Sequence, residues 1–277
     1  MTKKSPFIIT ALILSWSTIF AQTDLDQSTD EISNLFETGW SVGVNYGITQ
    51  FDGDIRQHDY SSAQTGLLYQ DSDFKELRSA FSISLEKNIN KNISISIENI
   101  SGEFAGLRRS NEYVGYDVYD PYGLSGPEGL NGDKFVTSFS ETDILLNYNL
   151  NSNISKFIKT ELPENLSIIV TVGFGLNEFR SLRTNLYTDN YIYSFGYDEL
   201  TKNESNDAVS ETVIVYGAKI KYEIQDGLSL LVDYTVRNSN SDKWDSSIMD
   251  GGNGGDRFSL FSFGLACEIP EKVITKD

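Results

Sequence analysis

The chain has 277 residues and a formal net charge of -18, with 22 Lys and Arg against 40 Asp and Glu. This balance excludes nucleic acid as a partner, because phosphate binding needs clustered Lys and Arg. The single cysteine, Cys267, excludes an internal disulfide, so an exported domain must be stable through strand pairing and packing alone.

The first 38 residues are predicted to lie outside the folded domain. Residues 1–21 read as a cleaved secretory signal peptide, since two lysines precede an apolar stretch from Phe7 to Phe20 and Ala21 is a small residue at the cut. The alternative, a membrane anchor helix, is disfavoured because the stretch falls short of the roughly 20 apolar residues that a bilayer requires. Residues 22–38 form an acidic periplasmic segment, expected either as a short helix at a barrel rim or without fixed structure.

Eight segments between residues 39 and 270 alternate apolar and polar side chains with a period of two, which predicts eight β-strands. The fifth is the cleanest, with Leu166, Ile168 and Val170 on one face and Ser167 and Thr171 on the other. In chain order the segments are Trp40–Phe51, Ser79–Ile89, a third that begins at Ile93, a fourth that ends at Leu150, then Leu166–Asn177, Ile214–Ile224, Leu228–Arg237 and Phe261–Ile269.

The connections between these segments alternate between long and short, with one of intermediate length at 151–165. A transmembrane barrel needs this pattern, whereas a soluble sandwich has no reason to sort its connections. We therefore predict an all-β fold, an eight-stranded antiparallel up-and-down transmembrane β-barrel over residues 39–270, with short periplasmic turns and long extracellular loops. Residues 271–277 would be a short periplasmic tail. The alternatives are a soluble sandwich or ligand-binding barrel, which would bury the same apolar rows.

One run in the first segment resembles the first strands of small eight-stranded Gram-negative outer-membrane barrels, of the OmpA transmembrane-domain and OmpX type. This run is Gly43-Val44-Asn45-Tyr46-Gly47-Ile48-Thr49-Gln50-Phe51-Asp52-Gly53-Asp54. Together with the topology and the alternation, the resemblance covers about residues 39–270. It implies a location in the cell outer membrane, contact with outer-membrane lipid and lipopolysaccharide, and a monomer.

If the apolar rows face lipid, the opposite rows fill a narrow lumen. These rows carry charges of both signs, which predicts a salt-bridged and largely closed interior. A structural or surface-interaction barrel is the leading interpretation, and a small gated channel or porin is the alternative. The predicted lumen charges are Glu86, Glu98, Asp143, Lys219, Lys221, Asp233, Arg237 and Glu268.

The third and fourth segments carry polar residues where their apolar faces should continue, for example Asn99 and Thr142. Either this hairpin rises above the membrane, or a bulge near Asn99 turns Ile100 and Phe104 outward.

The long loops are rich in Asp, Glu and Tyr, a composition that suits either loop packing over the barrel mouth or recognition of an extracellular ligand or protein. The run Gly251–Asp256 fits one Gly-Gly-x-Gly-x-Asp calcium repeat, but such repeats work in stacks, so we expect a hairpin loop at 250–256 rather than a cation site.

His58, the single histidine, lies near Asp52, Asp54 and Ser61, which leaves a lipid-modifying enzyme as a further alternative. We expect no enzyme activity and assign no catalytic, metal-binding or cofactor-binding residue.

Overall fold

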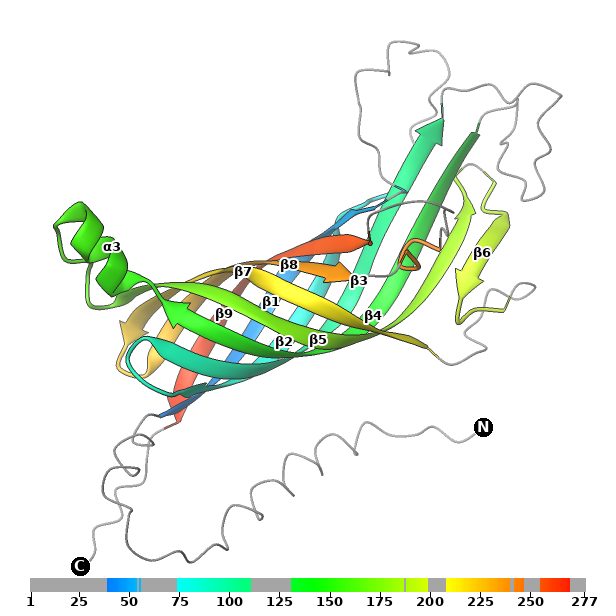
Figure 1. Cartoon of the computed structure of the whole chain (residues 1–277). Helices are drawn as coiled ribbons and strands as arrows, with labels where there is room; N and C mark the ends of the chain where they lie inside the picture. The colour runs from blue at the N-terminus through cyan, green and yellow to red at the C-terminus, as the bar shows by residue number, and fades with distance from the viewer. Residues whose placement is uncertain are drawn as a thin grey trace, which may run out of the picture. The chain divides into compact units, whose positions relative to one another are not determined.

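Eight antiparallel strands close into a ring in the order β4-β3-β2-β1-β9-β8-β7-β5, and β5 pairs again with β4 (Figure 1). This computed structural model describes residues 39–53, 55, 74–110, 131–186, 188–198, 208–239, 242–246 and 255–269. The closed ring confirms the predicted eight-stranded antiparallel barrel. Its strands are β1 (Trp40–Asp52), β2 (Arg78–Asn88), β3 (Ile93–Ser110), β4 (Asn131–Asn149), β5 (Leu166–Asn185), β7 (Val209–Gln225), β8 (Leu228–Ser239) and β9 (Arg257–Ile269).

Side chains alternate between the outside and the inside of the ring, because successive residues of a strand point to opposite faces. On β1, Val42, Val44 and Tyr46 are exposed, whereas Ser41, Gly43 and Asn45, which alternate with them, are buried. The pairing of β1 with β9 runs without a register shift from Trp40 to Asp52, so the alternation stays in phase across the seam between the first and last strands.

One end of the barrel, here called the turn end, holds the start of β1, the end of β9 and the short connections. In the turn between β2 and β3, the Asn90 side-chain oxygen accepts hydrogen bonds from the backbone nitrogens of Asn92 and Ile93, both at 2.9 Å. In the turn between β7 and β8, Gly227 has a φ of 74°, which a residue with a side chain rarely adopts. Local chemistry therefore fixes both predicted tight turns.

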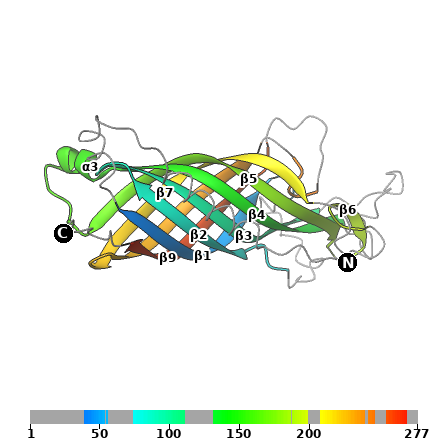
Figure 2. The same cartoon turned by 90° about the horizontal axis from the view of Figure 1, so that it is seen from below.

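The intermediate connection at the turn end contains a helix that the sequence analysis did not predict, α3 (Asn151–Ile158). Figures 1 and 2 both place α3 at this end of the barrel, away from β6. Within the described part of the chain, no helix is long and apolar enough to span a membrane.

Strands β3, β4 and β5 extend past the other strands at the opposite end, here called the loop end (Figure 1). The pairing of β3 with β4 runs without a register shift from Ile93 opposite Tyr148 to Ser110 opposite Asn131. Ile100 and Phe104 are fully buried inside the barrel. The predicted bulge that would turn them outward is therefore wrong, and the regular hairpin instead continues beyond the apolar part of the wall.

A second element was also not predicted: β6 (Tyr191–Phe195) folds back on the end of β5 and pairs with it (Figure 2). Several predictions concern residues outside those described, namely the signal peptide at 1–21, the acidic segment at 22–38, the tail at 271–277, His58, and Gly251–Gly254 of the glycine-rich run.

Candidate functional site

The outer wall of the barrel carries a continuous band of exposed apolar side chains. On β5 the outward row is Val170, Val172, Phe174 and Leu176, and on β9 it includes Phe263. A water-soluble domain would bury such rows, whereas a barrel in a bilayer presents them to lipid while its closed ring satisfies every strand edge. An eight-stranded barrel with an apolar outer band and a polar interior has the architecture of a bacterial outer-membrane protein.

The interior of the barrel is the candidate functional site, and Arg237 on β8 lies at its centre. Its side chain has no solvent exposure. Its Nε lies 2.6 Å from Glu141 Oε1 on β4, and its Nη2 lies 3.5 Å from Asp143 and 3.7 Å from Glu98. Because β3 and β8 are four strand positions apart in the ring in either direction, the contact between Arg237 and Glu98 crosses the lumen.

The arrangement of the three carboxylates explains why a cation is needed there. Glu98 on β3 and Asp143 on β4 are directly opposite in the strand register, a placement that is destabilising for two like charges. Glu141 is two residues along β4 on the same face. One guanidinium contacts all three carboxylates and attracts each of them, while its single positive charge balances one of the three negative charges.

Neutral side chains hold these carboxylates against the wall. Asn177 Nδ2 on β5 donates to Glu141 Oε2 at 2.6 Å, and the Ser82 hydroxyl on β2 donates to Glu98 Oε1 at 2.6 Å. Asn45 on β1 donates in turn to the Ser82 hydroxyl at 3.2 Å. The hydrogen-bonded network centred on Arg237 thus includes residues from β1, β2, β3, β4, β5 and β8.

Nearer the turn end, a second buried pair joins Lys219 on β7 and Asp233 on β8, with Nζ 3.7 Å from Oδ2. These residues are directly opposite in register. Further towards the turn end, Lys221 and Glu268 form an ion pair at 3.3 Å. A small pocket opens here, and its lining includes Ser41, Ser84, Glu86, Lys219, Lys221 and Leu231.

Towards the loop end, the interior changes from charged to aromatic. Phe104 is the centre of this cluster, with its ring centroid 4.8 Å from that of Phe258 and 5.5 Å from those of Phe51, Phe139 and Trp244. The Arg237 guanidinium carbon lies 5.6 Å from the Phe258 ring centroid, so a cation–π contact joins the charged and the aromatic layers.

A segment of the connection between β8 and β9, residues 242–246, folds into the mouth of the barrel above this cluster. Trp244 in this segment is fully buried. Its carbonyl oxygen accepts hydrogen bonds from the hydroxyls of Thr137 at 2.5 Å and Ser181 at 2.8 Å, which lie on β4 and β5. Residues 242–246, here called the plug segment, are thereby attached to the wall by their backbone as well as by the indole ring.

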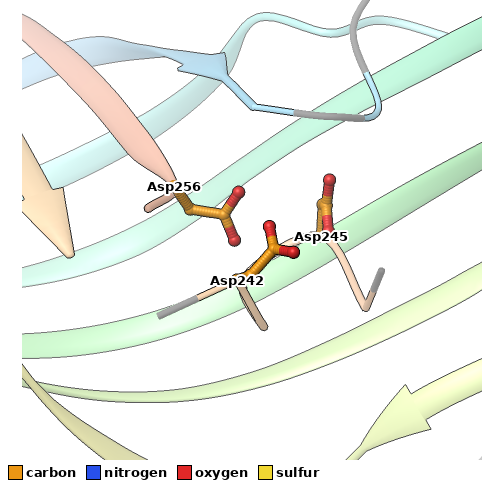
Figure 3. A group of neighbouring side chains, drawn as sticks. All are labelled: Asp242, Asp245 and Asp256. Atoms are coloured by element: carbon orange, nitrogen blue, oxygen red, sulfur yellow. The ribbon is translucent and has the colours of Figure 1, made fainter. Parts of the chain in front are cut away.

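Three aspartates meet where the plug segment joins the wall: Asp242, Asp245 and Asp256, whose carboxylate oxygens lie within 4.8 Å of one another (Figure 3). Carboxylates suit a hard cation such as Ca²⁺, which takes six to eight oxygen ligands. Two of these carboxylates already accept backbone hydrogen bonds, Asp245 Oδ2 from Ile55 at 3.0 Å and Asp256 Oδ2 from Trp244 at 2.7 Å. Those bonds account for the positions of two of the carboxylates by fixing the plug segment to the barrel, and they need no ion.

Sequence reasoning placed most of the interior charges and missed three features. Glu98, Asp143, Lys219, Asp233 and Arg237 are buried inside, while Glu86 and Lys221 are half-buried and Glu268 is exposed at the rim. Glu141, the aromatic cluster and the plug segment were not predicted. Extending the alternation of the fourth strand would have placed Glu141 and Phe139 inside, because Thr142 was already assigned to the outer face.

No protein-family model matches the chain, and its sequence matches no curated protein. Solved structures with a similar backbone include Neisserial surface protein A, at 9% identity and a TM-score of 0.46 over 83% of this chain and 97% of that chain. The outer membrane protein OprG from Pseudomonas aeruginosa is similar at 7% identity and a TM-score of 0.38, over 84% and 98%. Ail, the attachment invasion locus protein of Yersinia pestis, is similar at 12% identity and a TM-score of 0.37, over 83% and 99%. The eight-stranded barrel of this chain is established by its own strand pairing.

Proposed function

We propose that this protein is a non-conducting outer-membrane barrel with a structural or surface-interaction role. In this proposal the turn end faces the periplasm and the loop end faces outward, where lipopolysaccharide surrounds the wall and the long loops meet extracellular ligands or proteins. The ring is closed where the wall carries its apolar band, so the membrane-spanning part of the barrel needs no second copy to satisfy its backbone, which supports a monomer.

One observation carries the proposal: the interior is filled by two successive layers. The Arg237 network occupies the middle of the lumen, and the aromatic cluster with the plug segment occupies its loop end. An eight-stranded barrel is just wide enough for side chains to fill, so two packed layers leave little space for hydrated ions. The same filling disfavours the alternative of a small channel or porin, and it supports a role for the outer surface and the loops of the barrel.

No catalytic constellation emerges among the described residues. His58, on which the alternative of a lipid-modifying enzyme depends, lies outside them. The charged residues of the interior are engaged with one another across the lumen, in positions that lipid substrates in the membrane do not reach. These observations support a role without catalysis.

The proposal is tested by combining a folding assay with a conductance assay. The purified chain is refolded into lipid vesicles and run on a gel with and without boiling, where a closed barrel migrates differently until it is unfolded. The folded fraction is then added to a planar bilayer, and we expect no current above the baseline of the protein-free bilayer. Reproducible single-channel steps from the unmodified protein would overturn the non-conducting assignment and favour the channel.

A further inference from the structure

The helix α3 presents an apolar face that the described part of the chain leaves mostly uncovered, with Ile154 half-buried. Phe157 is 88% exposed and Ile158 is 46% exposed, and the helix buries none of its residues. Ile154 lies one helical turn before Ile158, so Ile154, Phe157 and Ile158 share one side of the helix. Ser152 and Lys156 lie on the opposite side.

The position of this helix is fixed by hydrogen bonds to the barrel. The Asn151 side chain donates to the Leu166 carbonyl oxygen and accepts from the Ile168 backbone nitrogen at 2.9 Å. The Leu150 backbone nitrogen donates to the Ile168 carbonyl oxygen at 2.8 Å. At the other end of the helix, the Leu162 nitrogen donates to the Ser155 hydroxyl at 3.3 Å, which holds the returning chain against the side of Ser155. These hydrogen bonds fix the orientation of α3 at the rim of the barrel, and they therefore fix the direction of its apolar face.

The helix also begins where the lipid-facing wall ends. Tyr148 is the last outward aromatic of β4 and precedes the first helical residue by three positions. Trp40 on β1 and Tyr222 on β7 are outward aromatics near the same rim, and Lys87 lies over the Trp40 ring at 5.3 Å. Aromatic residues gather at the boundary between hydrocarbon and headgroups. The chain therefore leaves the wall at that boundary, and α3 starts at the same level.

We propose that α3 is an interfacial anchor whose apolar face, Ile154, Phe157 and Ile158, inserts into the phospholipid leaflet at the turn end of the barrel. The occupant is argued from position, since the helix begins three residues after Tyr148, at the level where the lipid-facing band ends. Lys156 lies in the helix and Lys159 follows its last residue, while Glu161 and Glu164 lie in the returning chain. Because these charges cancel, insertion is driven by apolar burial and does not depend on anionic lipid.

The inference rests on the proposed membrane location, and the test separates the two. Cys267 is replaced by Ser in the full chain, and an environment-sensitive NBD label is placed at one new cysteine in the variants Phe157→Cys, Ser152→Cys or Tyr148→Cys. Each variant is refolded into phosphatidylcholine vesicles, and its folding is checked by the shift on boiling. Quenching is measured with nitroxide-labelled phosphatidylcholine in the bilayer and with iodide in the water. Ile158→Cys serves as a second probe of the apolar face.

The label at 157 is expected to be quenched by nitroxide lipid about twofold more than the label at 152, because one side of the helix enters the leaflet and the other does not. Quenching by iodide should show the opposite order, with the label at 152 quenched more than the label at 157. The inference is overturned if 157 and 158 match 152 while 148 is quenched by lipid, or if protection at 157 appears only at high protein density, which would indicate a second copy of the chain. Failure of lipid quenching at 148 would instead refute the membrane location itself.

Discussion

Arg237 and Glu141 form an ion pair between two side chains that have no solvent exposure, with 2.6 Å between Nε and Oε1. The pair joins β8 to β4 inside the ring. Because Arg237 also contacts Glu98 and Asp143, removing it leaves three carboxylates without their shared cation. The lumen is thus stabilised by one residue whose loss affects several strands at once.

The variant Arg237→Ala is expected to lower the free energy of unfolding by about 3–5 kcal/mol, the usual effect of removing one partner of a buried ion pair. The measurement is urea unfolding of the refolded barrel in lipid vesicles. Arg257→Ala is the matched control, because Arg257 pairs with Asp52 at the exposed loop end and such surface pairs contribute about 0–1 kcal/mol. Equal unfolding midpoints for the two variants would show that the Arg237 network does not stabilise the lumen.

The sequence was sufficient to predict the ring because alternation with period two is a local property that each strand displays by itself. The outer rows of β1, β5 and β9 follow the sequence pattern residue by residue. Helix α3 could not be predicted in this way, since its apolar residues form one short turn and its start depends on Asn151 bonding to Leu166 and Ile168 in the next strand.

The interior was harder to predict than the wall. Alternation tells which side chains point inward, but not which of them meet across the lumen, because that depends on the shear of the ring. The polar outer face beyond Asn99 looked like an error in the strand pattern. It is instead a regular continuation above the apolar band, with Ile100 and Phe104 supplying the aromatic and aliphatic packing inside.

Packing around the charged layer gives a second prediction. A Cβ on Gly175 would collide with Asp143 Oδ1, so Gly175→Ala must displace the carboxylate from Arg237. Overpacking of this kind lowers the free energy of unfolding by about 1–3 kcal/mol. Gly39→Ala is the control, since nothing lies within 4 Å of the Cβ it would add. Unfolding in urea should separate the two variants, and unchanged stability of Gly175→Ala would mean that the charged layer is loosely packed.

The assignment of the outer face to lipid gives a third prediction. Val172 lies in the middle of the outward row of β5 and is 52% exposed. Replacing it by Lys should make folding into a bilayer less favourable by about 2–4 kcal/mol, the effect of a basic side chain near the midplane. Ser140→Lys is the control, because Ser140 faces outward on β4 beyond the apolar band. If Val172→Lys folds into vesicles as well as Ser140→Lys does, lipid does not contact this row.

The two filled layers of the lumen predict that neither alone controls conductance. Trp244→Ala removes the indole that closes the loop end, yet the Arg237 network still fills the middle, so we expect little current in a planar bilayer. Combining Trp244→Ala with Arg237→Ser removes one large side chain from each layer and leaves Glu98, Glu141 and Asp143 around the opening. Those carboxylates favour cations, so the double variant should conduct with cation selectivity, measured as a reversal potential in a salt gradient.

Lys243→Ala is the control, since Lys243 lies in the plug segment but pairs with Glu211 at its edge. Full conductance from Trp244→Ala alone would show that the charged layer is no barrier, and an anion-selective double variant would contradict the placement of the three carboxylates.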